Sequence, residues 1–204
     1  MKLNLANKLT LFRIILVPVI MLIPIIDNLG GIQGEFLGIS TAFWIMNVIF
    51  IIASITDKLD GYIARSRNQV TTFGKFLDPL ADKILVLTAL VMLVEYGKLP
   101  GWIPVVVLAR EFIVSGYRML AVEKGGKVIA ASFWGKLKTA TTMVAIIVVF
   151  FDKFAFCSFL NTTMNAGEYV LNIIGSVLMI VSVIATIFSG YDYLKGGKEF
   201  LKDN

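Results

Sequence analysis

Four aspartates lie within a stretch of 26 residues: Asp57, Asp60, Asp78 and Asp82. The first two are spaced i, i+3 and the last two i, i+4, so on helices each pair lies on one face. Apolar segments of membrane length flank them, and a carboxylate is costly there because it loses its hydration. We therefore expect them to face a water-filled or ion-filled cavity. Mg²⁺ prefers carboxylate and phosphate oxygens, so two pairs on two helices joined by a basic loop could close around divalent cations.

Residues between and beside the aspartates fit phosphate chemistry. Two metal ions about 3.5–4 Å apart would clamp a pyrophosphate and stabilise the attacking and leaving oxygens. Gly61 and Gly74 remove side chains where a nucleotide would approach the backbone, and Ala64 does so less fully. Arg65 can offer a planar fork to phosphate oxygens. The chain has no histidine, so carboxylates, lysines and tyrosines are the groups left for proton transfer.

A structural interpretation of these residues also exists. Each aspartate could form an ordinary ion pair with a neighbouring lysine or arginine at the membrane surface. That account is weaker for the whole array, since ion pairing does not require two glycines and two carboxylate pairs at fixed intervals. Asp78-Pro79 is typical of a helix start, with Asp as N-cap and Pro at the first helical position. Both interpretations are compatible.

The elements that carry this array are predicted from hydropathy. In 204 residues, 57% are hydrophobic, 16% are charged and the mean hydropathy is +0.83, which indicates an all-α polytopic membrane protein. The second and third apolar blocks reach full span only by including their motif ends. The predicted six transmembrane helices lie near Leu9–Ile26, Ala42–Thr56, Ala81–Tyr96, Trp102–Val122, Leu137–Phe151 and Tyr169–Phe188.

The amino terminus resembles a signal peptide, but it carries Arg13 and no small-x-small cleavage site follows. We interpret it as a retained first span after a short interfacial segment, Met1–Lys8. With no internal repeat or linker, residues 1–204 are expected to form a single domain. Several aromatic side chains are expected to face lipid or the membrane interface: Phe43, Trp44, Phe50, Trp102, Phe133 and Trp134.

Charge predicts the orientation. Of the 19 Lys and Arg, only Lys98 and Lys153 fall in the joints after the third and fifth blocks, and the joint Asp27–Thr41 has none. The positive-inside rule therefore places both termini and the basic joints 57–83 and 118–138 in the cytoplasm, on the side of the aspartates. Positive charge there suits anionic headgroups and phosphorylated substrates, although topology alone also accounts for it.

The array resembles the signature of the CDP-alcohol phosphotransferases. That family's pattern is D-x2-D-G-x2-A-R-x8-G-x3-D-x3-D, and residues 57–82 match its eight fixed positions and all their spacings. Six predicted spans, with the motif between the second and third, agree with the family over nearly the whole chain. The resemblance implies an integral protein of the cell or inner membrane that transfers a phosphatidyl or substituted phosphoryl group from a CDP-linked donor to an alcohol, releasing CMP.

The resemblance also implies roles for individual residues. Asp57, Asp60 and Asp78 would hold two divalent ions, Mg²⁺ or Mn²⁺. Asp82 would be the general base on the acceptor hydroxyl and would also contact metal. The residues implied to line the pocket for the CDP-linked donor are Gly61, Ala64, Arg65, Gly74 and Thr10.

Basic residues elsewhere bear on the acceptor. Arg110 lies in mid-span beside Glu111, where an ionised residue is a functional candidate, although a buried pair that only fixes helix packing is an alternative. Arg118 and Lys136 lie near the expected cytoplasmic ends of their helices and could meet in a basic pocket next to the metal site. Such a pocket favours an acceptor that carries its own phosphate.

Within the family, the chain is most similar to members that join CDP-diacylglycerol to glycerol-3-phosphate. Members using inositol phosphate are the nearest alternative, and serine-using or cardiolipin-forming members rank lower. The implied partners are these two substrates, membrane lipids and a second copy of the chain, with no nucleic acid. The clusters that carry this similarity are Asn7/Thr10/Arg13, Arg110-Glu-Phe with Arg118, and Gly135-Lys-Leu-Lys-Thr.

Two other classes of protein share some of these features. A cation transporter could also place carboxylates within a helical bundle. All four aspartates lie at one expected membrane face, however, and no second acidic site or pair of broken helices suggests alternating access. A catalytically inactive lipid-binding homologue is disfavoured by the complete aspartate set.

Overall fold

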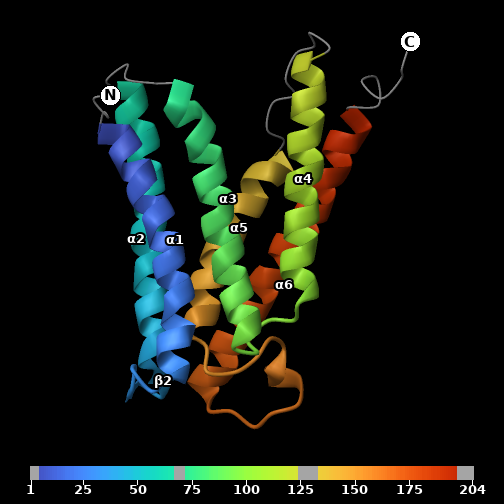
Figure 1. The fold of residues 1–204 in the computed structure, drawn as a ribbon. Coiled ribbons are helices and arrows are strands. Elements are labelled where there is room, and N and C mark those ends of the chain that lie inside the picture. The colour runs from blue at the N-terminus through green and yellow to red at the C-terminus, as the bar shows by residue number, and fades with distance from the viewer. Residues whose placement is uncertain (1–4, 67–71, 124–132, 197–204) are drawn as a thin grey trace.

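The computed structural model describes residues 5–66, 72–123 and 133–196, which form a bundle of six α-helices (Figure 1). Backbone alone is described at residues 5–6, 58–66, 72–73, 75–76, 121–123 and 196. The helices are α1 (Leu5–Asn28), α2 (Thr41–Ser66), α3 (Thr72–Glu95), α4 (Trp102–Glu123), α5 (Phe133–Phe151) and α6 (Ala166–Gly196).

The bundle has two distinct ends. At one end lie the start of α1 and the end of α6, together with the end of α2 and the start of α3, which carry the aspartates (top of Figure 1). We name this the motif end. The opposite hairpin end carries the antiparallel strands β1 (Glu35–Phe36) and β2 (Ile39–Ser40) and the 3₁₀ helix η1 (Ser158–Leu160).

The predicted all-α membrane fold is confirmed in its coarse form. Three helical segments in the described residues are long and apolar enough to cross a membrane: Asn7–Asn28, Phe133–Phe151 and Ala166–Lys195. In α2 the apolar part is shorter, Thr41–Asp57, because the polar motif occupies the rest of the helix. Of the predicted interfacial segment, residues 5–8 belong to α1, and residues 1–4 lie outside the described part.

The core is apolar and contains two of the aromatic residues that the sequence predicts to face lipid. Phe50 is fully buried and Phe43 nearly so, which makes that expectation wrong for both. Phe43 packs against the rings of Tyr96 and Phe150, because this face of α2 meets α3 and α5 inside the bundle. Trp102 and Phe133 are exposed, as expected.

The motif aspartates lie within helices rather than in a loop. Because α2 continues to Ser66 and α3 begins at Thr72, the connection between them is confined to residues 67–71, which lie outside the described part. The interpretation of Asp78 as a helix N-cap is wrong, since Pro79 lies inside α3. A membrane helix can continue through proline because neighbouring groups satisfy the carbonyl that loses its donor.

A buried polar network closes the hairpin end. Asn172 is fully buried and uses both ends of its amide: Nδ2 donates to Asp152 Oδ2 (2.7 Å) and to the Ala155 carbonyl (2.9 Å), and Oδ1 accepts from the Phe159 amide (2.9 Å). Lys98 donates to the carbonyls of Asp152 and Lys153. Burial lowers the pKa of Lys98 and raises the pKa of Asp152. This network fixes the connection between α5 and α6.

Candidate functional site

Helix α1 binds two of the motif aspartates. The Thr10 hydroxyl donates to Asp78 Oδ1 at 2.6 Å, and Arg13 Nη1 lies 2.8 Å from Asp57 Oδ1. Thr10 and Arg13 are one helical turn apart and both are buried. One face of α1 therefore connects the motif end of α2 to that of α3, and it holds the two carboxylates in defined positions.

Asp82 lies near two pairs of charges. Its carboxylate interacts electrostatically with Asp57 and Arg13, and also with Lys138 and Glu111. Its Oδ1 atom is buried and has no hydrogen-bond partner among the described residues. A buried carboxylate oxygen without a partner is rare in folded proteins, and it fits a site that receives a proton or a cation.

Part of the predicted site lies outside the described side chains. Asp60, Gly61, Ala64 and Arg65 belong to α2, but their side chains are not described. Gly74 is buried on α3. Among the side chains that are described, no group of three or more acidic, histidine or cysteine residues could hold a metal ion. The metal set and the donor-pocket set stay predictions.

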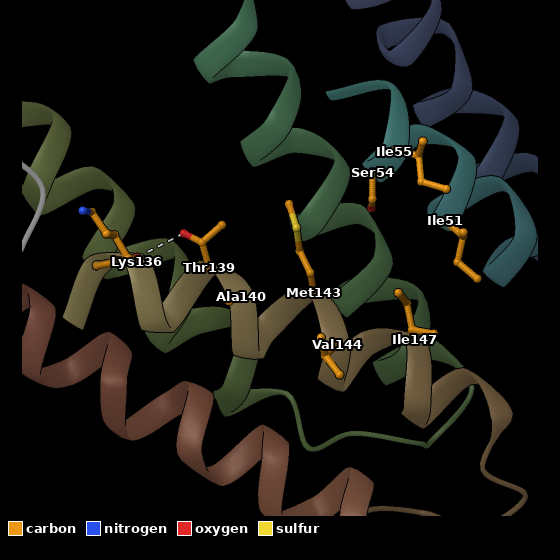
Figure 2. A pocket seen from close by; sticks show the side chains of 10 residues that line it. Ile51, Ser54, Ile55, Lys136, Thr139, Ala140, Met143, Val144 and Ile147 are labelled. Carbon is orange, nitrogen blue, oxygen red and sulfur yellow. Dashed lines mark hydrogen bonds between the residues drawn. The ribbon is translucent and has the colours of Figure 1, made fainter. Parts of the chain in front are cut away.

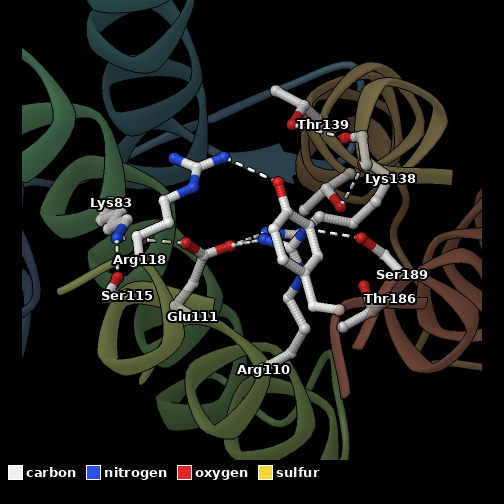
Figure 3. Close-up of polar contacts among 12 residues, drawn as sticks. Lys83, Arg110, Glu111, Ser115, Arg118, Lys138, Thr139, Thr186 and Ser189 are labelled. Atoms are coloured by element: carbon white, nitrogen blue, oxygen red, sulfur yellow. Dashed lines mark hydrogen bonds and ion pairs between the residues drawn. The ribbon is translucent and has the colours of Figure 1, made fainter. Parts of the chain in front are cut away.

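A second cluster surrounds Glu111 (Figure 3). Glu111 Oε1 accepts from Arg110 Nη1 at 3.0 Å and from Lys138 Nζ, while Oε2 lies 3.4 Å from Lys83 Nζ. Lys83 also donates to Ser115 Oγ at 2.6 Å. One carboxylate thus gathers cations from α3, α4 and α5. Because Lys83 follows Asp82 in the chain, this cationic cluster adjoins the aspartate site.

Tyr193 of α6 joins two arginines to the cluster. Its hydroxyl accepts from Arg118 Nη2 at 2.8 Å, and the ring centroid lies 5.5 Å from Arg118 Cζ and 5.6 Å from Arg110 Cζ. Arg110 also donates to Ser189 of α6. The structure therefore brings together Arg110 and Arg118, which the sequence singled out. It adds Lys83, Lys138 and Tyr193, which the sequence did not.

The third predicted basic residue, Lys136, lies elsewhere. It lines a mainly apolar groove of about 610 Å³ between α2 and α5 (Figure 2). From α2 the groove takes Ile51, Ser54 and Ile55, and from α5 a stripe that continues through Thr139 to Ile147. Lys136 and Lys138 point to different sides because two residues turn a helix by about 200°. Lys138 faces the core, with Thr142 and Ala145.

The comparisons with known proteins agree with the motif. A sequence model of the CDP-alcohol phosphatidyltransferases matches residues 3–188. The chain belongs to this family. It is 39% identical over 200 residues to the CDP-diacylglycerol--glycerol-3-phosphate 3-phosphatidyltransferase of Bacillus subtilis, covering 98% of this chain and 97% of the relative. The enzyme of the same name from Haemophilus influenzae is 36% identical over 208 residues, covering 100% and 98%.

A relative from Mycobacterium tuberculosis, a probable phosphatidylglycerophosphate synthase, is 36% identical over 197 residues, which cover 94% of this chain and 80% of the relative. Membership in the CDP-alcohol phosphatidyltransferase family accounts for the aspartate array, which the alternative of a cation transporter does not. It also relates the two neighbouring clusters to one reaction, since such a transferase must bind both an activated donor and an alcohol.

Proposed function

We propose that this chain transfers the phosphatidyl group of CDP-diacylglycerol to glycerol-3-phosphate, giving phosphatidylglycerophosphate and CMP. The strongest support is full-length similarity to the Bacillus subtilis enzyme named for this reaction. The position of the cationic cluster beside Asp82 adds support, because an acceptor with its own phosphate needs cations next to the reacting hydroxyl.

We place the general base at Asp82. The acceptor hydroxyl attacks the phosphorus that carries the diacylglycerol group, the bond from that phosphorus to the CMP oxygen breaks, and CMP departs. The hydroxyl proton passes to the Asp82 carboxylate, whose Oδ1 has no hydrogen-bond partner among the described residues. Asp57 and Arg13, both near this carboxylate, fix its electrostatic surroundings.

We propose two divalent ions, Mg²⁺ or Mn²⁺, at Asp57, Asp60, Asp78 and Asp82. The donor set is all oxygen and suits hard cations. Asp57 and Asp78 are already held in place from α1, and Asp82 Oδ1, which has no hydrogen-bond partner in the described part of the chain, fits a group that needs positive charge. When bound, such ions supply positive charge that offsets the charge developing on the diphosphate.

We assign the α2–α5 groove to the acyl chains of the donor. Its lining is mainly apolar, and it extends from Lys136 along α5 to Ile147. The apolar residues suit hydrocarbon chains, and Lys136 lies at the end nearest the start of α5, where it suits the diphosphate of the same donor. This assignment moves Lys136 from the acceptor to the donor.

We propose that all six helices cross the membrane with the motif end in the cytoplasm. The start of α1, the end of α6 and the motif lie at that end of the bundle (Figure 1). Lys98 and Lys153, in the joints after α3 and α5, lie at the hairpin end. The positive-inside rule supports this orientation. A homodimer and binding of membrane lipids are proposed from the family alone.

The decisive experiment measures CMP release by the purified protein in detergent. CDP-diacylglycerol and Mg²⁺ are supplied, and the acceptors glycerol-3-phosphate, inositol phosphate, serine and phosphatidylglycerol are tested singly. We expect release with glycerol-3-phosphate alone, loss with EDTA, and recovery with Mg²⁺ or Mn²⁺. Release with inositol phosphate instead would retain the chemistry and overturn the acceptor. If none of the four acceptors supports CMP release, the proposed function is contradicted.

A further inference from the structure

Arg110 and Arg118 present a problem of like charge. They are eight residues apart on α4, about 12 Å along the helix axis, yet both guanidinium groups approach the same tyrosine ring. Lys83 and Lys138 lie nearby around Glu111. Three of these four cationic side chains thus contact the Glu111 carboxylate, and Arg118 does not. Like charges this close repel one another, so other groups must hold the cations in place against that repulsion.

Arg118 differs from the other three cations in its contacts. It is exposed, and the described residues give it no carboxylate; it contacts the Tyr193 hydroxyl at 2.8 Å and the face of the same ring. By contrast, Arg110 is held by Glu111 and Ser189. The charge of Arg118 is therefore available to an anion, while its position depends on one residue of another helix.

Tyr193 is suited to that task. Its side chain is 2% exposed, so the ring cannot move without disturbing the packing of α4 against α6. The ring face attracts a guanidinium, and the hydroxyl adds a directional bond to Arg118. Neither contact neutralises the arginine, whereas a carboxylate in this place would compete with a bound phosphate. The residue therefore orients two cations without reducing their total charge.

We propose that Tyr193 is a positioning residue that sets the spacing of Arg110 and Arg118 so that both face the phosphate of the acceptor. This inference rests on the proposed function, because it assigns these arginines to that phosphate. A phosphate monoester carries about −1.5 to −2 charges near neutral pH, which would offset part of the excess of three cations over carboxylates in the cluster. The alcohol end of the same molecule then faces Asp82, next to Lys83.

The test compares Tyr193→Phe with Tyr191→Phe. The first variant keeps the ring and removes the bond to Arg118, while the second alters an exposed tyrosine on the same helix. We expect Tyr193→Phe to raise the KM for glycerol-3-phosphate about fivefold, the effect of one lost hydrogen bond. The KM for CDP-diacylglycerol and kcat should stay within about twofold, and Tyr191→Phe should match the wild type. Inorganic phosphate should inhibit Tyr193→Phe more weakly in competition with the acceptor.

A double-mutant cycle separates positioning from general damage. In an Arg118→Ala background, which should itself raise the acceptor KM more than the donor KM, Tyr193→Phe should add little, because its partner is gone. Equal changes of both KM values, a lower kcat alone, or full additivity with Arg118→Ala would overturn the inference. If wild type releases no CMP with any phosphorylated acceptor, the proposed function fails. If wild type is active and Tyr193→Phe is unchanged, only this inference fails.

Discussion

The two ends of the bundle each bury a polar cluster, but they treat polar groups differently. At the hairpin end, Asn172 makes three hydrogen bonds and Lys98 donates to two carbonyls. At the motif end, Asp82 Oδ1 and Arg110 Nε are buried without hydrogen-bond partners among the described residues. The first cluster is complete in itself, whereas the second leaves groups for a ligand to satisfy.

This difference separates structural from functional polarity. A buried polar group without a partner costs stability, so a fold keeps one where a bound molecule will later supply the partner. Both ends contain lysines and aspartates, and their residue types alone do not distinguish them. The distinction follows from counting the hydrogen-bond partners of each buried polar atom. It predicts that substitutions at the hairpin end change stability alone, whereas substitutions at the motif end change kinetics, with or without a loss of stability.

The largest effect should come from Asp82→Asn. The amide cannot accept the acceptor's proton, so we expect kcat to fall by at least about a hundredfold. Binding of radiolabelled CDP-diacylglycerol to the purified protein should change much less. Glu95→Gln, at the exposed far end of the same helix, is the matched control. Near-native turnover in Asp82→Asn would remove the base assignment.

Asn172→Ala should break the opposite cluster. Three hydrogen bonds are lost in a fully buried place, and we expect about 2–3 kcal/mol less stability, seen as a lower melting temperature in detergent. The KM values of the protein that stays folded should not change. Asn161→Ala, an exposed position in the same connection, should be neutral. A specific change in the acceptor KM of Asn172→Ala would contradict the distinction between the two ends.

Asp57→Asn should affect both stability and metal dependence. Asp57 pairs with fully buried Arg13, and its own side chain is 29% exposed, so we expect a loss of about 1–2 kcal/mol after solvent screening. The Mg²⁺ concentration for half-maximal activity should also rise. Asp78→Asn, whose described partner is the neutral Thr10 hydroxyl, should raise the Mg²⁺ requirement at a smaller cost in stability. Unchanged Mg²⁺ dependence in both variants would argue against the metal assignment.

The smallest effect should come from Lys136→Ala. Because Lys136 lines the groove, we expect about a fivefold rise in the KM for CDP-diacylglycerol, as for one exposed ionic contact, and no change for the acceptor. Lys153→Ala, at the hairpin end, serves as the control. A rise in the acceptor KM alone would return Lys136 to the acceptor pocket, where the sequence had placed it.

The aspartate site could be predicted from sequence because its information is local. The spacing of Asp57, Asp60, Asp78 and Asp82 implies shared helix faces, and the structure places all four within helices. The order and type of the six elements also followed from hydropathy. Their ends did not, since α6 begins at Ala166 and continues to Gly196 through residues too polar for an apolar block.

The cationic cluster could not be predicted in the same way. Its members extend from Lys83 to Tyr193 and meet only when α3, α4, α5 and α6 pack together. Lys136 and Lys138 occur in one basic run, so the sequence does not show which of them reaches the acceptor pocket. The rotation of α5 that separates them is set by packing. Tyr193 carries no local signal, because a tyrosine near a helix end is common at membrane interfaces.

The two faces of α5 have a consequence for how substrates enter the enzyme and how products leave it. One face lines the mainly apolar groove, and the other, with Lys138, faces the cationic cluster. On the proposed function, the fatty substrate enters sideways from the bilayer and the water-soluble one enters from the cytoplasm. Neither blocks the other's route, so the lipid product can diffuse away laterally while CMP returns to water.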